Sequence, residues 1–204
     1  MKRLITITLV LTGLFCVSCE EKEKDSNKDP EGNPTVKKYT IGSYYNENGV
    51  KGIVYEINED STKGMIVSMD ETTLQWARNE ASAEVSREAF DYEDGVANME
   101  KIKPYIDNYP AFKWCNDKGN GWYLPALNEL FMISASREEL SSSLVANGGT
   151  QLTTDGQYWS STEVDPSQPG ANSTFAYLMT FNSMNYTSST AKTGSNKVRA
   201  IRAF

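Results

Sequence analysis

Segments with strand character lie at both ends of residues 38–204, and segments with helical character lie between them. The strand-like segments are rich in β-branched and aromatic residues, and they cover residues 39–42, 52–57, 64–69, 158–161, 175–181 and 197–203. The sequence Asn-Glu-Asn-Gly at residues 46–49 predicts a turn between the first two. An order of strands, helices and strands predicts the α+β class. Because strands open and close the domain, we expect its two ends to lie side by side in one antiparallel sheet.

At least two helices are expected in the middle of the domain. Residues 96–105 carry apolar side chains at three- and four-residue spacing, which predicts a helix. Pro110 and Pro125 each stand where the first turn of a helix accepts proline, so we expect two further helices to begin there. Ser136 is expected to cap another helix, with Glu139 completing a capping box.

The first 18 residues predict an export signal. Residues 1–3 are Met-Lys-Arg, and residues 4–17 form an almost wholly apolar run without charge. This run is shorter than the roughly 20 apolar residues that span a bilayer, and it fits the central region of a signal peptide. It ends in Ser18-Cys19, which resembles the lipobox of bacterial lipoproteins. We expect cleavage before Cys19 and lipid on that cysteine. The alternative is an ordinary secretory signal with an incidental cysteine.

Residues 19–37 are expected to form a flexible tether behind the lipid. Residues 20–36 combine many charges with Pro, Gly and Asn, so they cannot bury enough apolar surface to fold. The acidic start, Glu20-Glu21, resembles the signal that exports some Gram-negative lipoproteins to the cell surface. A second interpretation is that the charges only keep the tether solvated. The predicted location is the outer membrane at the cell surface, and the lipid anchor is the predicted membrane contact.

The composition argues against several kinds of site. The net charge is −7 and the pI is near 4.8, and the sequence has no basic stripe to meet nucleic-acid phosphates. The chain contains no histidine, which is the commonest general base and a common metal ligand. No spaced cluster of zinc ligands is found either. We therefore expect no cofactor, no metal and no nucleic-acid partner. Cys115 is interpreted as a small core residue.

Six acidic side chains lie close together in the sequence, which leaves hydrolysis by paired carboxylates conceivable. They are Glu80, Glu84, Glu88, Asp91, Glu93 and Asp94. Runs of charge on a helix usually form its solvated face, and that is the competing interpretation.

Three ordered motifs carry a family resemblance. They are Gly-Trp-Tyr-Leu-Pro-Ala-Leu-Asn-Glu-Leu at residues 121–130, Tyr-Trp-Ser-Ser-Thr-Glu at 158–163 and Val-Arg-Ala-Ile-Arg at 198–202. Together they resemble the Lcl-like C-terminal domain family, a domain of unknown function. The resemblance covers roughly residues 52–204. It implies one C-type-lectin-like domain over residues 38–204, with a fold related to formylglycine-generating enzymes. The catalytic cysteines of those enzymes and the calcium-binding tripeptides of sugar-binding lectins are missing, so neither activity is carried over.

Most motif residues are interpreted as structural. The rings of Trp114, Trp122 and Trp159 are expected in the core. Pro125 is expected to start a helix. Glu129 is expected to satisfy backbone amides or the hydroxyls of residues 160–162, because buried polar groups need partners. Alternation along a strand places Arg199 and Arg202 on opposite faces. One of these arginines is expected to pair with an acid.

Residues 182–196 form a polar stretch rich in Asn, Ser, Thr and Tyr. The plainer interpretation is a long loop between two strands. The alternative is a binding surface, since paratopes combine rigid Tyr rings with small hydrogen-bonding residues. Some C-type-lectin-like proteins diversified by retroelements vary this region. The candidate ligand-binding residues are Tyr177, Asn182, Ser183, Asn185, Tyr186, Thr187 and Asn196.

Three classes of function follow from the sequence. The favoured class is a surface-exposed lipoprotein with a non-catalytic domain for ligand binding or adhesion, directed at a glycan or a protein. The alternative is a structural accessory subunit of a surface appendage or assembly. A cryptic hydrolase that uses carboxylates is third. An exposed strand edge would favour assembly, and a polar-aromatic patch would favour binding.

Overall fold

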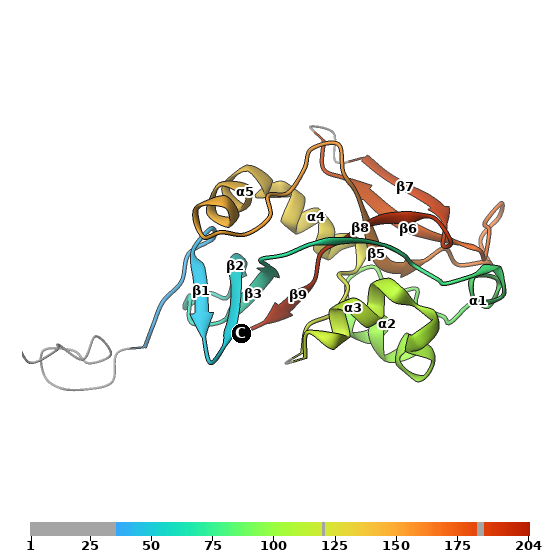
Figure 1. The fold of residues 1–204 in the computed structure, drawn as a ribbon, viewed down its shortest axis with the longest axis horizontal. Helices are drawn as coiled ribbons and strands as arrows, with labels where there is room; N and C mark the ends of the chain where they lie inside the picture. The colour runs from blue at the N-terminus through green and yellow to red at the C-terminus, as the bar shows by residue number, and fades with distance from the viewer. Residues whose placement is uncertain (1–35, 120, 183–185) are drawn as a thin grey trace, which may run out of the picture. The chain divides into compact units, whose positions relative to one another are not determined.

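A four-stranded antiparallel sheet joins the start of the domain to its end (Figure 1). The computed structural model describes residues 36–119, 121–182 and 186–204, so the predictions for the signal peptide, Cys19, most of the tether, Ser183 and Asn185 lie outside the described residues. The strand order is β1-β2-β3-β9, with β1 at Tyr44–Glu47, β2 at Val50–Ile57, β3 at Gly64–Ser68 and β9 at Ile201–Ala203. The first and last strands lie in one antiparallel sheet, as expected, but they are not adjacent: β9 pairs with β3, and β1 lies at the opposite edge.

The first strand begins later than predicted. Residues 39–42 are not a strand, and Gly42 has a φ of 80°. A Cβ atom at Gly42 would lie 2.7 Å from Oε1 of Glu139, so the chain passes close against the later helix there. The hairpin turn consists of Asn48 and Gly49, with φ values of 51° and 78°. Two positive φ values are what a two-residue turn between twisted strands requires.

The second sheet has five strands in the order β4-β8-β5-β6-β7. Their bounds are β4 Thr72–Gln75, β5 Gln157–Glu163, β6 Phe175–Thr180, β7 Tyr186–Ala191 and β8 Ser195–Val198. Neighbours are antiparallel except β5 and β8, which meet in parallel at Tyr158 and Lys197. The long loop expected over residues 182–196 is wrong. Residues 186–191 form β7, which pairs with β6. This pairing stabilises a strand that lacks apolar alternation.

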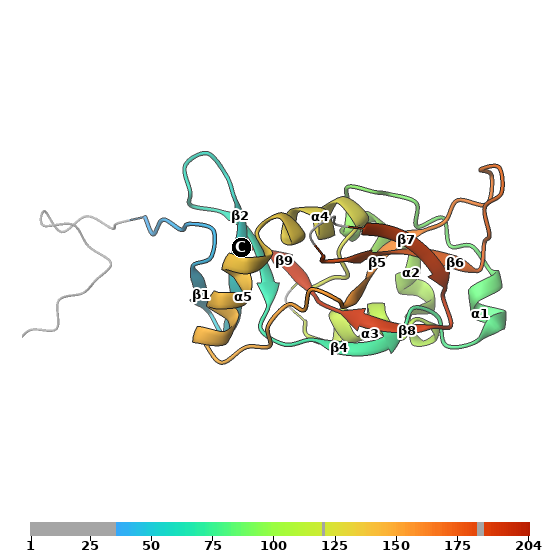
Figure 2. The ribbon, with the colours of Figure 1, turned by 90° about the horizontal axis from the view of Figure 1, so that it is seen from above.

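The final strand predicted over residues 197–203 is divided between the two sheets. β8 ends at Val198, and β9 begins at Ile201. Between them the Arg199 guanidinium donates to the carbonyl of Ser68 at 3.0 Å and to that of Thr150 at 2.8 Å. These contacts fix the crossing point. Figure 2 shows β4 and β8 side by side, with β9 continuing toward the other sheet.

The helices lie between β4 and β5 in the chain. They are α1 Glu80–Glu84, α2 Gly95–Ile102, the 3₁₀ helix η1 Lys103–Asn108, α3 Pro110–Asp117, α4 Leu127–Ala135 and α5 Arg137–Ala146. The Asp94 side chain caps α2 by accepting the N–H groups of Val96 and Ala97. The helix predicted over residues 96–105 ends early because Pro104 cannot continue the α-helical ladder. Pro110 begins α3, as predicted.

Two predicted helix starts differ in detail. Pro125 precedes Ala126, the N-cap of α4, so it lies outside the first turn. Glu129 Oε2 accepts the Ala126 N–H at 2.7 Å, which supplies half of a capping box. Ser136 stands at the N-cap of α5, but its side chain makes no capping hydrogen bond. The capping box predicted for Ser136 and Glu139 is therefore wrong.

The core of the helical side is built on aromatic rings. Trp76 packs edge-on against Phe112, with ring centroids 4.9 Å apart. Trp159 is fully buried and Trp122 is nearly so, which agrees with their predicted packing role. Trp114 is only partly buried, and its ring lies 3.9 Å from the Lys118 ammonium. No helix in the described part of the chain is long and apolar enough to cross a membrane.

Candidate binding surface

The predicted ligand-binding residues are divided between the two faces of the β6–β7 hairpin. Tyr177 pairs with Ser189, and Thr180 pairs with Tyr186. Side chains alternate along strands, so Tyr177 and Thr187 share one face while Tyr186 lies on the other. Tyr186 is 58% exposed, and Thr187 is also exposed.

Two further candidates lie away from this hairpin face. Asn196 is on β8, separated from β7 by β5 and β6, so it does not join the set. Asn196 is close to the other candidates in the sequence but not in the sheet. Asn182 follows β6 and lines a separate polar hollow.

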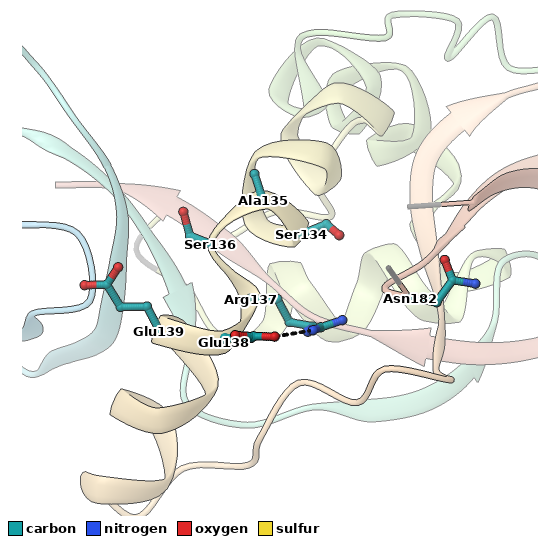
Figure 3. Close-up of a pocket in the computed structure, with 7 residues that line it drawn as sticks. All are labelled: Ser134, Ala135, Ser136, Arg137, Glu138, Glu139 and Asn182. Atoms are coloured by element: carbon teal, nitrogen blue, oxygen red, sulfur yellow. Dashed lines mark hydrogen bonds and ion pairs between the residues drawn. The ribbon is translucent and has the colours of Figure 1, made fainter. Parts of the chain in front are cut away.

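A polar hollow of about 380 Å³ lies where α4 meets α5, beside the end of β6 (Figure 3). Its lining residues are Ser134, Ala135, Ser136, Arg137, Glu138, Glu139 and Asn182. The Arg137 guanidinium donates to the carbonyl of Phe181 and lies 3.3 Å from Glu138. Guanidinium, carboxylate and amide groups therefore meet here. This set suits a hydrogen-bonding ligand better than an apolar one.

Three exposed apolar side chains and one partly buried ring lie on or near α4, and we name Tyr92, Phe131, Met132 and Tyr177 the Tyr92 surface. The rings of Tyr92 and Tyr177 are 5.5 Å apart. The Tyr92 carbonyl accepts the Asn128 N–H at 2.9 Å, which joins the aromatic pair to α4. Phe131 and Met132 are 49% and 45% exposed, and they border a hollow of about 460 Å³. Exposed apolar side chains that gather on one surface can mark an interaction site.

Glu129 lies at the base of this hollow. Its Oε1 accepts the Tyr123 hydroxyl at 2.6 Å, and its Oε2 accepts the N–H groups of Ala126 and Gly95 at 2.7 and 3.2 Å. Burial raises the pKa of Glu129 to about 7, against the opposing effect of these hydrogen bonds. The expected role in satisfying backbone amides is observed, although the hydroxyls of residues 160–162 find other partners. Thr162 Oγ1, for example, donates to the Asp91 carbonyl at 2.9 Å.

Two of the acidic residues between 80 and 94 bond to the backbone. Asp91 accepts the backbone N–H groups of Glu93 and Asp94, and Asp94 caps α2. Glu80 and Glu84 bound the short helix α1. No group of three or more Cys, Asp or Glu side chains that could hold a metal occurs within the described ranges.

Two buried ion pairs escaped the sequence analysis. Lys192 Nζ donates to Glu163 Oε1 at 2.8 Å with both side chains fully buried. Arg199 donates to Glu71 at 2.6 Å, and the same carboxylate accepts Lys197. We expected one of the two arginines, Arg199 or Arg202, to pair with an acid, but nothing in the sequence identified Glu71 as that acid. The other arginine, Arg202, is half-buried on β9 and donates to the Ala203 carbonyl.

The comparisons with known proteins show a shared fold and nothing finer. No protein-family model matches the sequence, and no curated protein matches it. The crystal structure of a fimbrial protein from Bacteroides ovatus ATCC 8483 is similar, with a TM-score of 0.60 and 18% sequence identity. The match covers 81% of this chain and 49% of the fimbrial protein, so this chain spans about half of that protein's length. The two proteins share a mixed α+β fold.

Proposed function

We propose that this chain is a surface lipoprotein that serves as a non-catalytic subunit or accessory of a surface appendage. The observation that carries the proposal is the fold shared with a fimbrial protein over 81% of this chain. The N-terminal features fit it, because a signal ending in Ser18-Cys19 would place lipid at the head of a solvated tether. The Lcl-like resemblance, with its C-type-lectin-like fold, is retained as part of the proposal.

A non-catalytic role is supported by what the acids do. Asp91 and Asp94 hold turns and a helix end, and Glu163 is occupied by Lys192. Glu129 has a raised pKa, which is a feature of many catalytic acids. Its two oxygens, however, already accept three hydrogen bonds that anchor α2 and α4. Glu129 therefore has a structural use for each oxygen.

Adhesion is the second candidate, and exposed aromatic surface favours it. Tyr186 projects from β7 with 58% of its surface exposed, while the Tyr92 surface lies on the opposite face of the hairpin. Tyr supplies much contact area at low entropic cost. The polar hollow around Arg137 and Asn182 adds hydrogen-bonding groups that suit a glycan. An appendage accessory that also adheres to a ligand satisfies both candidates.

The appendage proposal is tested in the bacterium that encodes the chain. Appendages are sheared from cells and purified, and an antibody against the domain is used to probe them by blotting and by immunogold electron microscopy. We expect the chain in the appendage fraction and its label on filaments. A chain confined to the interior of the cell, with no label on filaments, would contradict the proposal.

The anchor is tested on the same cells. Mass spectrometry of the wild-type chain should show diacylglyceryl-modified Cys19 as the first residue. The Cys19→Ala variant should leave the membrane fraction, because the remaining sequence offers only a solvated tether. Cys16→Ala is the matched control and should remain anchored. A Cys19→Ala chain that stays with the membrane would disprove lipid anchoring at this site.

A further inference from the structure

β7 is the most open of the four edge strands in the described part of the chain. It has six residues, against four each for β1 and β4 and three for β9. A bridge from Tyr123 to Ile201 covers the outer side of β9, and β1 carries the charged Glu47. β7 reads Tyr-Thr-Ser-Ser-Thr-Ala and has neither charge nor proline. Charges, proline and bulges are the devices that normally prevent an edge strand from pairing.

The backbone of β7 is regular and presents unused hydrogen-bonding groups. Its register with β6 runs without a shift from Tyr186 to Ala191. The next residue, Lys192, donates its N–H to the Thr174 carbonyl across the same ladder at 2.8 Å. In an antiparallel ladder the inward and outward residues alternate, so Thr187 and Ser189 direct their N–H and C=O groups outward. Within residues 36–119, 121–182 and 186–204 no group bonds to these outward atoms.

We infer that β7 pairs antiparallel with β7 of a second copy of this chain, around a two-fold axis at Ser188. In this register Thr187 of one copy meets Ser189 of the other in a hydrogen-bonded pair, and the symmetry repeats the contact. Ser188 lies opposite its own counterpart, and Tyr186 lies opposite the partner's Thr190. Every outward group of Thr187 and Ser189 then has a partner. Figure 1 shows β7 at the border of its sheet, where an added strand would continue it.

The side chains of β7 favour a second copy over other occupants. A two-fold contact places like residues together, so charges on the strand would repel, and β7 has none. The pairs formed are Thr with Ser and Tyr with Thr, which are among the favourable cross-strand combinations. The inference deepens the appendage-subunit proposal and rests on it for the presence of many copies on one surface.

Disulfide cross-linking of the full-length chain in cells tests the pairing. Opposed residues in a non-hydrogen-bonded pair have Cα atoms about 4.5 Å apart, within the range that a disulfide bridges. Ser188→Cys should therefore give a covalent dimer on mild oxidation, seen on a non-reducing gel. The native Cys115 is fully buried, and the wild-type chain measures the background.

Register provides the matched controls. Thr187→Cys is the more exposed position on the same strand, but it faces the partner's residue 189, so its own dimer should still be about tenfold weaker than that of Ser188→Cys. Co-expressed Thr187→Cys and Ser189→Cys chains should cross-link to each other. Adding Thr187→Lys to Ser188→Cys should remove most of the dimer, because lysine on an edge opposes pairing. Melting temperatures of the variants check that the fold is retained.

Several results would overturn the pairing. One is the absence of a Ser188→Cys dimer, and another is equal dimer from Thr187→Cys and Ser188→Cys, which indicates random collision. A cross-link from Ser188→Cys to a different polypeptide would show that β7 pairs with that polypeptide and not with a second copy of this chain. If the dimer is absent while sheared appendages still contain the chain, the pairing fails and the appendage role stands.

Discussion

Lys192 Nζ donates to Glu163 Oε1 at 2.8 Å, and neither side chain has exposed surface. The ammonium also donates to the carbonyls of Ser173 and Ala83. Burial lowers the pKa of Lys192, against the opposing effect of the Glu163 charge. This one ammonium therefore ties α1, the end of β5 and the segment before β6 to the residue that follows β7.

Breaking this pair should be costly. Lys192→Met leaves the Glu163 carboxylate buried without its cation, and we expect the free energy of unfolding to fall by about 3–5 kcal/mol. Adding Glu163→Gln should cost less than the two single changes together, because the partners are coupled. Urea unfolding measures each value. The exposed pair Lys103–Glu100 supplies the control, since Lys103→Met should change stability by less than about 1 kcal/mol. Equal losses at the two lysines would refute this view.

Glu129 should make stability depend on pH. Its folded pKa is raised to about 7, so between its unfolded value and about 7 the folded state binds more protons than the unfolded state. The contribution of Glu129 to stability is therefore present at low pH and is lost as pH rises to about 7. The loss should total about 3 kcal/mol. The difference in unfolding free energy between wild type and Glu129→Gln, measured across this range, should show it. A difference that does not change with pH would contradict the assignment.

The three motif tryptophans should differ in proportion to their burial. Trp159→Ala should lower the free energy of unfolding by about 3–5 kcal/mol, because the ring is fully buried and its Nε1 donates to the Leu74 carbonyl at 3.0 Å. Trp122→Ala should lower the free energy of unfolding by nearly as much. Trp114→Ala is the comparison, and its cost should be smaller because that ring is partly exposed. Chemical denaturation measures all three, and a Trp114→Ala loss as large as that of Trp159→Ala would be evidence against this order.

Tyr186 and Tyr177 should separate in a binding assay because they lie on opposite faces of the hairpin. A glycan and protein array probed with the chain identifies the ligand. Tyr186→Ala should then weaken binding by about thirtyfold if its face is the contact, since a hot-spot tyrosine contributes about 2 kcal/mol. The melting temperature should hardly change, because the side chain is 58% exposed. Tyr177→Ala is the control for the other face. Binding that neither change affects would exclude the hairpin as the site.

The α+β class and many element positions followed from local pattern. β2, β3, α3 and the end of β6 lie close to where spacing and proline placement predicted them. Two strands that were not predicted share one cause. β7 and β4 lack apolar alternation, and their pairing with β6 and β8 stabilises them as strands. The capping box predicted at Ser136 is not formed, whereas Glu129 accepts the Ala126 N–H at the start of α4.

The sequence by itself determined the α+β class, the lack of histidine chemistry and the burial of Trp122 and Trp159, since these depend on side-chain type and spacing. The tertiary structure alone decided which distant groups meet. It joined Glu163 to Lys192 and Glu71 to Arg199, and it removed Asn196 from the hairpin. It also put Tyr177 and Tyr186 on opposite faces. The physical reason is that strand register and sheet order fix these neighbours, and both are set by packing between segments far apart in the chain.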